Sequence, residues 1–138
     1  MHHQLSKFAL NLIFTSIFLL AVIPFAWPAL SDQEGKLFPV LSTLEIVSYD
    51  KQPEGVYLYV EFAKLRQCEF IQMVWYRGNA IIPLITRPDD PSTIPITRPV
   101  GEAVSGPWLL ETFSLQGTNA IVQHRCHPLW YTYTNFYP

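Results

Sequence analysis

The stretch that decides the fold runs from Cys68 to Ile82 and reads CEFIQMVWYRGNAII. Its side chains alternate with a period of two, which is typical of a strand with two different faces. One face of that strand holds Cys68, Phe70, Gln72, Val74 and Tyr76, and the other holds Ile71, Met73 and Trp75. Gly78-Asn79 then separates two apolar runs, which indicates a two-residue hairpin turn. The stretch therefore predicts two antiparallel strands.

The same alternation recurs on both sides of this hairpin. No segment after residue 31 has a sustained helical stripe. About seven short strands, separated by Gly, Pro, Asn and Asp, predict an all-β protein with a small antiparallel β-sandwich. The other expected strands are Thr43–Tyr49, Val56–Phe62, Leu109–Leu115, Ala120–Cys126 and Trp130–Tyr137.

An immunoglobulin-like arrangement is the leading expectation, because the two cysteines fall in an early strand and in the penultimate strand. Trp75 follows Cys68 too closely to match the usual core tryptophan of such domains, so the expected topology is analogous only.

A proline-rich stretch, Pro83–Pro107, interrupts the strand pattern and holds half of the 12 prolines of the chain. Proline cannot donate to a strand ladder, so most of this stretch is expected to be irregular. It is either an exposed contact loop that presents Arg87 and Arg98 to a partner, or a solvated crossover between the two sheets.

The stretch Phe8–Leu30 contains no charged side chain. As a helix it would reach about 34 Å, enough to cross a hydrocarbon layer of roughly 30 Å. Lys7 precedes it, which favours a cytoplasmic N-terminus. The sequence thus predicts a cytoplasmic tail over residues 1–7, a transmembrane helix over 8–30 in contact with lipid, a linker over 31–42 and an exported domain over 43–138.

A cleaved signal peptide is the alternative for the same stretch. Pro24 and Pro28 are expected to break the helix, and Ala29-Leu30-Ser31 offers small residues at −3 and −1 of a cleavage site. Both alternatives export the C-terminal part of the chain.

Composition indicates that part of the chain avoids water, and it argues against one class of partner. Charged residues make up 14% of the chain, against about 25% in ordinary soluble domains. A net charge of −2 gives no basic footprint, which argues against a nucleic-acid partner.

The densest cluster of reactive side chains is His124-Arg125-Cys126-His127. A disulfide between Cys68 and Cys126 is the expected pairing in an oxidising compartment, and His124 is then a hydrogen-bonded core or interface histidine. A zinc site made of Cys68, His124, Cys126 and His127 is the weaker alternative, because strand alternation points His127 away from the other two. A catalytic Cys–His pair is weaker still.

The C-terminal segment carries large aromatic residues on both faces of its expected strand, and such residues are enriched at protein contacts. No nucleophile elbow, phosphate-binding glycine loop or metalloprotease motif is present in the sequence. We therefore expect no enzyme activity and no cofactor. The residues expected to contact a partner are Arg87, Arg98, Trp108, Trp130, Tyr131, Tyr133, Phe136 and Tyr137.

Several motifs between residues 65 and 138 resemble a group of short uncharacterised bacteriophage and prophage proteins. The strongest are His124–Trp130 (HRCHPLW) and Thr134–Pro138 (TNFYP). The others are Cys68–Phe70, Trp75–Asn79, Arg98–Gly101 and Gly106–Trp108. The resemblance implies a phage or bacterial-host setting and brings no catalytic residues with it.

These observations predict a single-span protein of the inner (cytoplasmic) membrane whose domain lies on the periplasmic or extracellular side. Its expected role is to bind another membrane or envelope protein, as an accessory subunit or as a phage factor acting at the host envelope. The alternatives are a secreted soluble binding protein, or a zinc- or cysteine-dependent envelope hydrolase.

Overall fold

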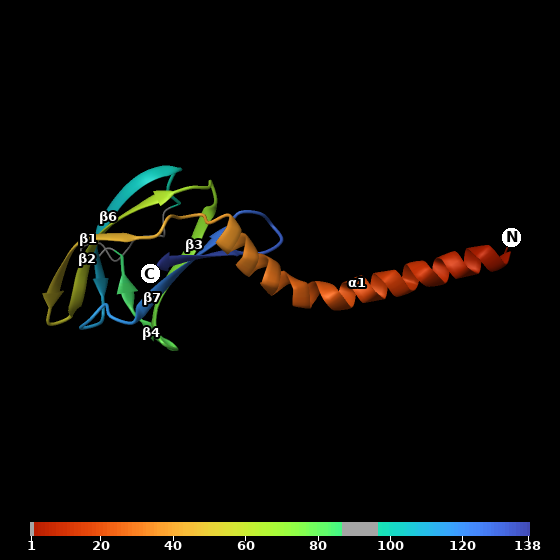
Figure 1. Cartoon of the computed structure of the whole chain (residues 1–138), viewed down its shortest axis with the longest axis horizontal. Coiled ribbons are helices and arrows are strands. Elements are labelled where there is room, and N and C mark those ends of the chain that lie inside the picture. Colours follow the sequence, from red (N-terminus) through yellow and green to blue (C-terminus); the bar gives the residue numbers. More distant parts are fainter. Residues whose placement is uncertain (1, 87–96) are drawn as a thin grey trace.

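A long helix leads into a body made of two β-sheets (Figure 1). The computed structural model describes residues 2–86 and 97–138, and the proposed contact residue Arg87 lies outside them. The elements are α1 (His2–Leu37), β1 (Glu45–Gln52), β2 (Gly55–Lys64), β3 (Glu69–Arg77), β4 (Ala80–Ile82), β5 (Leu84–Ile85), β6 (Gly101–Leu110), β7 (Thr118–Arg125) and β8 (Thr132–Tyr137).

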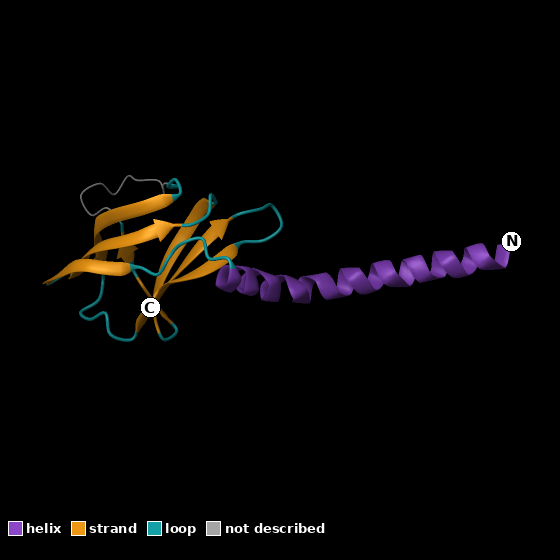
Figure 2. Ribbon diagram, turned by 45° about the horizontal axis from the view of Figure 1, so that its top comes forward, coloured by secondary structure: helices purple, strands orange, loops and turns teal. Residues whose placement is uncertain are grey.

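The strands form two four-stranded sheets, with the orders β1-β2-β6-β5 and β4-β3-β7-β8. Every neighbouring pair within each sheet is antiparallel. Figure 2 shows the strands gathered at one end of the molecule and the helix extending away from them. The predicted antiparallel architecture with one N-terminal apolar helix is confirmed, and the two sheets are consistent with a sandwich.

The core lies between the two sheets and is built from both. Leu58 and Leu110 contribute from the first sheet, and Trp75 and Phe136 contribute from the second, with 1% exposure or less for each side chain. Edge-to-face packing of Phe62 on Phe136, with ring centroids 5.1 Å apart, joins β2 to β8.

The predicted division of β3 into two faces is wrong at one point. The register with β7 shifts between Phe70 and Gln72, which marks a bulge. As a result Phe70 and Met73 both pack against the core, on the same side as Trp75. A bulge exchanges the two faces of a strand because the side-chain period is two.

Part of the proline-rich stretch forms strands rather than a loop. β6 begins at Gly101, so the predicted strand Leu109–Leu115 is wrong in its start and its end. Gly106 and Pro107 occupy a register shift opposite Tyr59, where a proline needs no ladder donor. A Cβ on Gly106 would lie 2.7 Å from the backbone oxygen of Leu58, so this close approach requires glycine.

The predicted end of the N-terminal helix is also wrong. Pro24 and Pro28 lie inside α1, which continues to Leu37 through more than half of the expected linker over residues 31–42. Proline is tolerated in apolar helices, although each one removes a backbone hydrogen bond. Figure 1 shows that α1 bends on its way to the body, and these two prolines account for the bend.

Candidate functional site

The place where α1 meets the body is the most highly connected polar site among the described residues, and we call it the Glu34 junction. Oε2 of Glu34 accepts hydrogen bonds from Trp130 Nε1 at 2.8 Å and Thr132 Oγ1 at 3.0 Å, and lies 3.2 Å from His127 Nε2. Oε1 of Glu34 accepts a hydrogen bond from Arg66 Nη2 at 2.9 Å. Charge-assisted hydrogen bonds of this kind are stronger than neutral ones.

Further contacts extend the Glu34 junction along the helix. Ser31 is buried, and its hydroxyl donates to the backbone oxygen of Tyr131. Arg66 uses its second nitrogen, Nη1, to donate to the backbone oxygen of Phe38 at 2.8 Å. One guanidinium therefore holds both the last turn of α1 and the chain that follows it.

Gly35 lets the backbones of α1 and β8 touch. An ideal Cβ at this position would lie 1.7 Å from the backbone oxygen of Tyr133 and 2.8 Å from its carbonyl carbon. Real Cβ atoms do not come this close to backbone atoms, so any side chain at position 35 would push the helix off the strand.

An aromatic cluster continues the Glu34 junction toward the apolar part of α1. Trp130 packs edge-on against Trp27, with ring centroids 6.1 Å apart. His127 packs edge-on against Trp130 at 4.2 Å. Trp27 belongs to the uncharged stretch over residues 8–30, so Trp130 touches both the apolar and the polar part of the helix.

The Glu34 junction is built to hold elements together. Its carboxylate already accepts hydrogen bonds on both oxygens, which leaves it poorly placed to act as a general base or a metal ligand. Within residues 2–86 and 97–138, no group of three or more His, Cys, Asp or Glu side chains is arranged to hold a metal ion.

Cys68 and Cys126 form a disulfide, which confirms the predicted pairing. The four residues of the zinc alternative therefore lie in three separate settings. The two sulfurs are bonded to each other, His124 packs against Phe70 in the interior, and His127 faces Glu34. A cysteine binds zinc as a thiolate, so the disulfide removes two of the four proposed ligands.

Two basic side chains are buried beside this disulfide. His124, predicted to be a hydrogen-bonded core or interface histidine, is 1% exposed and lies in the interior. Its Nδ1 has no hydrogen-bond partner among the described residues, so the predicted bond is not seen at that atom. Lys64 is 3% exposed, and its Nζ donates to the backbone oxygens of Cys68 at 2.7 Å and Arg98 at 2.6 Å.

Burial opposes a positive charge on either side chain. Desolvation lowers the pKa of Lys64. Desolvation, together with the charge of Lys64, lowers the pKa of His124 to about 4. His124 is therefore neutral near pH 7.

Several residues expected to contact a partner are used inside the molecule instead. Trp108 and Phe136 are 5% and 1% exposed and belong to the core, so the prediction that they contact a partner is wrong. Trp108 and Phe136 lie on the inward faces of β6 and β8, where the large side chains of each strand pack into the core. Tyr137 packs on Trp75 with ring centroids 5.0 Å apart.

The remaining predicted contacts lie nearer the surface. Arg98 Nη2 donates to Ser105 Oγ at 3.0 Å, which ties the residues just before β6 to that strand. Trp130 belongs to the Glu34 junction. Tyr133 is 44% exposed, and its hydroxyl accepts a hydrogen bond from Gln123 at 3.3 Å.

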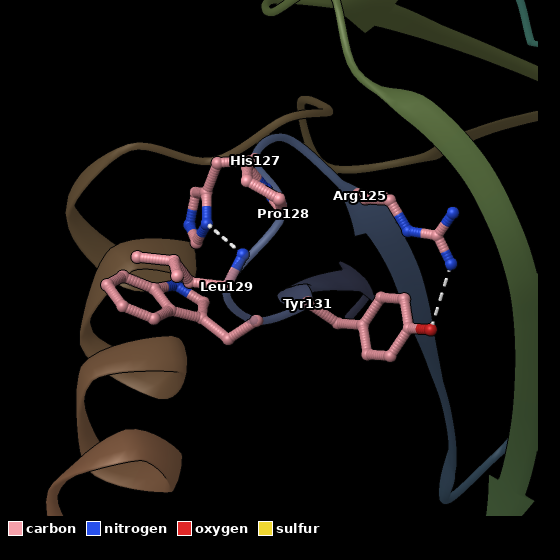
Figure 3. Close-up of a pocket in the computed structure, with 6 residues that line it drawn as sticks. Arg125, His127, Pro128, Leu129 and Tyr131 are labelled. Atoms are coloured by element: carbon pink, nitrogen blue, oxygen red, sulfur yellow. Dashed lines mark hydrogen bonds between the residues drawn. The ribbon is translucent and has the colours of Figure 1, made fainter. Parts of the chain in front are cut away.

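The loop between β7 and β8, residues 126–131, encloses a shallow hollow on the body (Figure 3). Tyr131 lines one side and accepts a hydrogen bond from Arg125 Nη2 at 3.0 Å, with the guanidinium carbon 5.3 Å from the ring centroid. On the other side, His127 Nδ1 accepts a hydrogen bond from the backbone nitrogen of Leu129 at 3.3 Å. The hollow lies beside the last turns of α1.

The sequence does contain a signal for the residues of the Glu34 junction that were missed. Trp27, Ser31, Glu34 and Gly35 recur at helical spacing, so a helix continued beyond Leu30 places them on one face. The predicted linker over residues 31–42 hid this pattern, because a polar stretch with Gly35 and Pro39 is also typical of a linker.

Comparisons with protein-family models, with curated proteins and with solved structures found no match.

Proposed function

We propose that this chain is a membrane-anchored interaction module without catalytic activity, which holds its β-body at a fixed height and orientation on the outer side of a cytoplasmic membrane. The observation that carries the proposal is the docking of α1 onto the body at the Glu34 junction. A helix that is only a leader has no need of these contacts.

The apolar helix supports the anchor. α1 includes a stretch that is long and apolar enough to cross a membrane by length and composition. Thr15 and Ser16, two polar residues of this stretch, donate to the backbone oxygens of Asn11 and Leu12 at 2.8 Å. Their hydroxyls are therefore satisfied without water.

The contacts of α1 also favour retention over cleavage. Cleavage after Ser31 would remove Trp27 and Ser31, and with them the packing on Trp130 and the hydrogen bond to Tyr131. The disulfide supports an oxidising compartment for the body, and the positive charge of Lys7 supports a cytoplasmic N-terminal side.

We further propose that the body is immunoglobulin-like. The strand orders support this, because β1-β2-β6-β5 and β4-β3-β7-β8 correspond to the A-B-E-D and C′-C-F-G sheets of that fold. Trp75 is fully buried on β3, the counterpart of strand C. The disulfide departs from the antibody pattern, since it joins the ends of β3 and β7, which are neighbours in one sheet.

The outer side of the β1-β2-β6 sheet is the surface best suited to a protein partner. Val47, Tyr59 and Val104 are 60%, 44% and 67% exposed. β1 is an edge strand, and such strands present unpaired backbone groups to an added strand. We therefore assign the contact with a protein partner to this surface and no longer to the C-terminal aromatic residues.

The resemblance to phage and prophage proteins supports a bacterial envelope as the setting. The proposed partner is another membrane or envelope protein, with this chain as an accessory subunit or a phage factor. The enzyme alternatives are less well supported, because both cysteines are consumed in the disulfide.

Purification of the full chain in mild detergent, followed by intact mass spectrometry, tests the proposal. We expect an unprocessed N-terminal segment, a mass two hydrogens below that of the reduced chain, and a partner in fixed stoichiometry. Val104→Lys should release that partner, whereas Phe113→Lys, at a side chain 80% exposed in the loop after β6, should not. A soluble chain that begins at Asp32 would overturn the anchor and support a secreted factor.

A further inference from the structure

We propose that the loop over residues 126–131 is a second membrane contact, whose tip lies in the headgroup layer of the phospholipid bilayer that α1 crosses. This inference rests on the anchoring proposed above. It assigns a ligand, the zwitterionic phospholipid interface, to the hollow and the aromatic cluster beside the Glu34 junction.

The height of the loop relative to the span follows from its contacts with α1. Trp130 touches Trp27, inside the uncharged stretch, and donates to Glu34, beyond it. Glu34 lies four residues after Leu30, about 6 Å further along a helix. The headgroup region of each leaflet is roughly 5–8 Å thick, so Trp130 lies at its level.

The side chains at the tip suit this layer. Leu129 is 62% exposed and Pro128 is exposed as well, next to an indole of the kind that settles at membrane interfaces. Figures 1 and 2 show the loop extending from the body on the side from which α1 leaves. The apolar tip is therefore turned toward the membrane that the span would occupy.

The charges around the loop indicate which lipid it meets. Three basic side chains beside the loop and the last turns of α1 each have an acidic partner, so their charges are balanced and do not favour anionic lipid. The ion pairs are Lys36–Asp32 at 2.6 Å, Arg66–Glu34 at 2.9 Å and Arg125–Glu69 at 3.3 Å. Contact with a zwitterionic interface through apolar and aromatic groups fits this balance.

Tryptophan quenching by brominated lipid tests the inference. The full chain is reconstituted into phosphatidylcholine vesicles whose acyl chains carry bromine near the glycerol end. Leu129→Trp is compared with Phe113→Trp, since Phe113 lies in the loop at the opposite end of β7 and is 80% exposed. We expect the tryptophan added at position 129 to lose at least about half of its fluorescence, as an indole at the interface should. The tryptophan added at position 113 should be unaffected.

Flotation with the vesicles separates this inference from the anchor on which it rests. A wild-type chain that does not float overturns the anchor. A chain that floats while Leu129→Trp stays as bright as Phe113→Trp overturns the loop contact alone. Quenching that appears only after phosphatidylglycerol is added would also overturn it, because the proposed contact needs no anionic lipid. Should Leu129→Trp fail to fold, Pro128→Trp probes the same tip.

Discussion

At the level of single residues, Gly35 has the largest consequence for the molecule because it carries no side chain. It lies in a helix, where glycine is normally unfavourable, and it lies against the backbone of β8. Substitution by alanine should therefore stabilise an undocked helix but destabilise a docked one. The sign of the change in the free energy of unfolding tests whether the helix is docked.

Gly35→Ala is expected to destabilise the body by about 1–3 kcal/mol, as overpacked sites do, because the new Cβ collides with the backbone oxygen of Tyr133. In an undocked helix the same change would stabilise by roughly 1 kcal/mol. Urea unfolding of the full chain in mild detergent measures the difference. Gln33→Ala, at an exposed neighbouring position, is the control and should be nearly silent.

His124 gives the body a predictable response to acid. Its pKa is 6.5 in an unfolded chain and about 4 in the folded one, because burial and the charge of Lys64 oppose protonation. The contribution of His124 to the free energy of unfolding is complete above pH 6.5 and is lost as the pH falls toward 4. The total loss is about 3 kcal/mol, at 1.36 kcal/mol per pKa unit.

His124→Leu should remove this part of the pH dependence, because leucine fills a similar volume and does not titrate. Free energies of unfolding at several pH values between 7 and 4 provide the measurement. If the two proteins lose stability in parallel, the pKa of His124 is the same in the folded and unfolded states, and the assignment is wrong.

At the level of elements, α1 and β8 depend on each other through the carboxylate of Glu34. Glu34→Gln keeps the size of the side chain but removes its charge and one acceptor, at an expected cost of about 2 kcal/mol for hydrogen bonds to a charged group. Asp32→Asn changes an exposed ion pair two residues away and should cost less than about 1 kcal/mol.

Protease susceptibility around Phe38, where α1 ends and the body begins, reports whether the helix has come loose. We expect faster cleavage for Glu34→Gln than for Asp32→Asn. Equal rates for the two variants would mean that the Glu34 junction does not hold the helix in place.

The elements were predictable where local pattern decides them. Period-two alternation found β2, β3, β7 and β8, and the Gly78-Asn79 turn found β4. The bulge in β3 was not predictable, because the fit of Phe70 and Met73 against the opposite sheet decides it. The start of β6 was hidden by Gly101, Gly106 and Pro107, residues that a strand accepts only at an irregular position.

At the level of the whole molecule, the disulfide closes a long loop, with a sequence separation of 58 between its cysteines. Replacing both Cys68 and Cys126 by alanine should lower the free energy of unfolding by up to about 4 kcal/mol, the loop-entropy value for this length. Thermal unfolding of the double variant, beside the wild type with and without reductant, measures the loss. A change below about 1 kcal/mol would show that the cross-link contributes little.

The candidate site was less predictable than the fold. The disulfide was found because compartment and strand position agree on it. The Glu34 junction was missed because its partners lie about 100 residues apart in the chain, from Ser31 to Tyr131, and only the folded body brings them together. The aromatic C-terminal segment was assigned to a partner because alternation alone does not say which face another sheet covers.

Because α1 continues without a break to its contact with β8, the orientation of the body depends on the orientation of the helix. Transmembrane helices lean by roughly 20° from the bilayer normal, and neighbouring proteins change that lean. If α1 crosses a membrane as proposed, the unbroken helix between Leu30 and Leu37 and its contact with β8 would pass each change of tilt on to the far loops of the β-body. Under the proposed anchoring, a partner bound to the span and a second partner bound to the far loops would therefore be coupled through the tilt of α1.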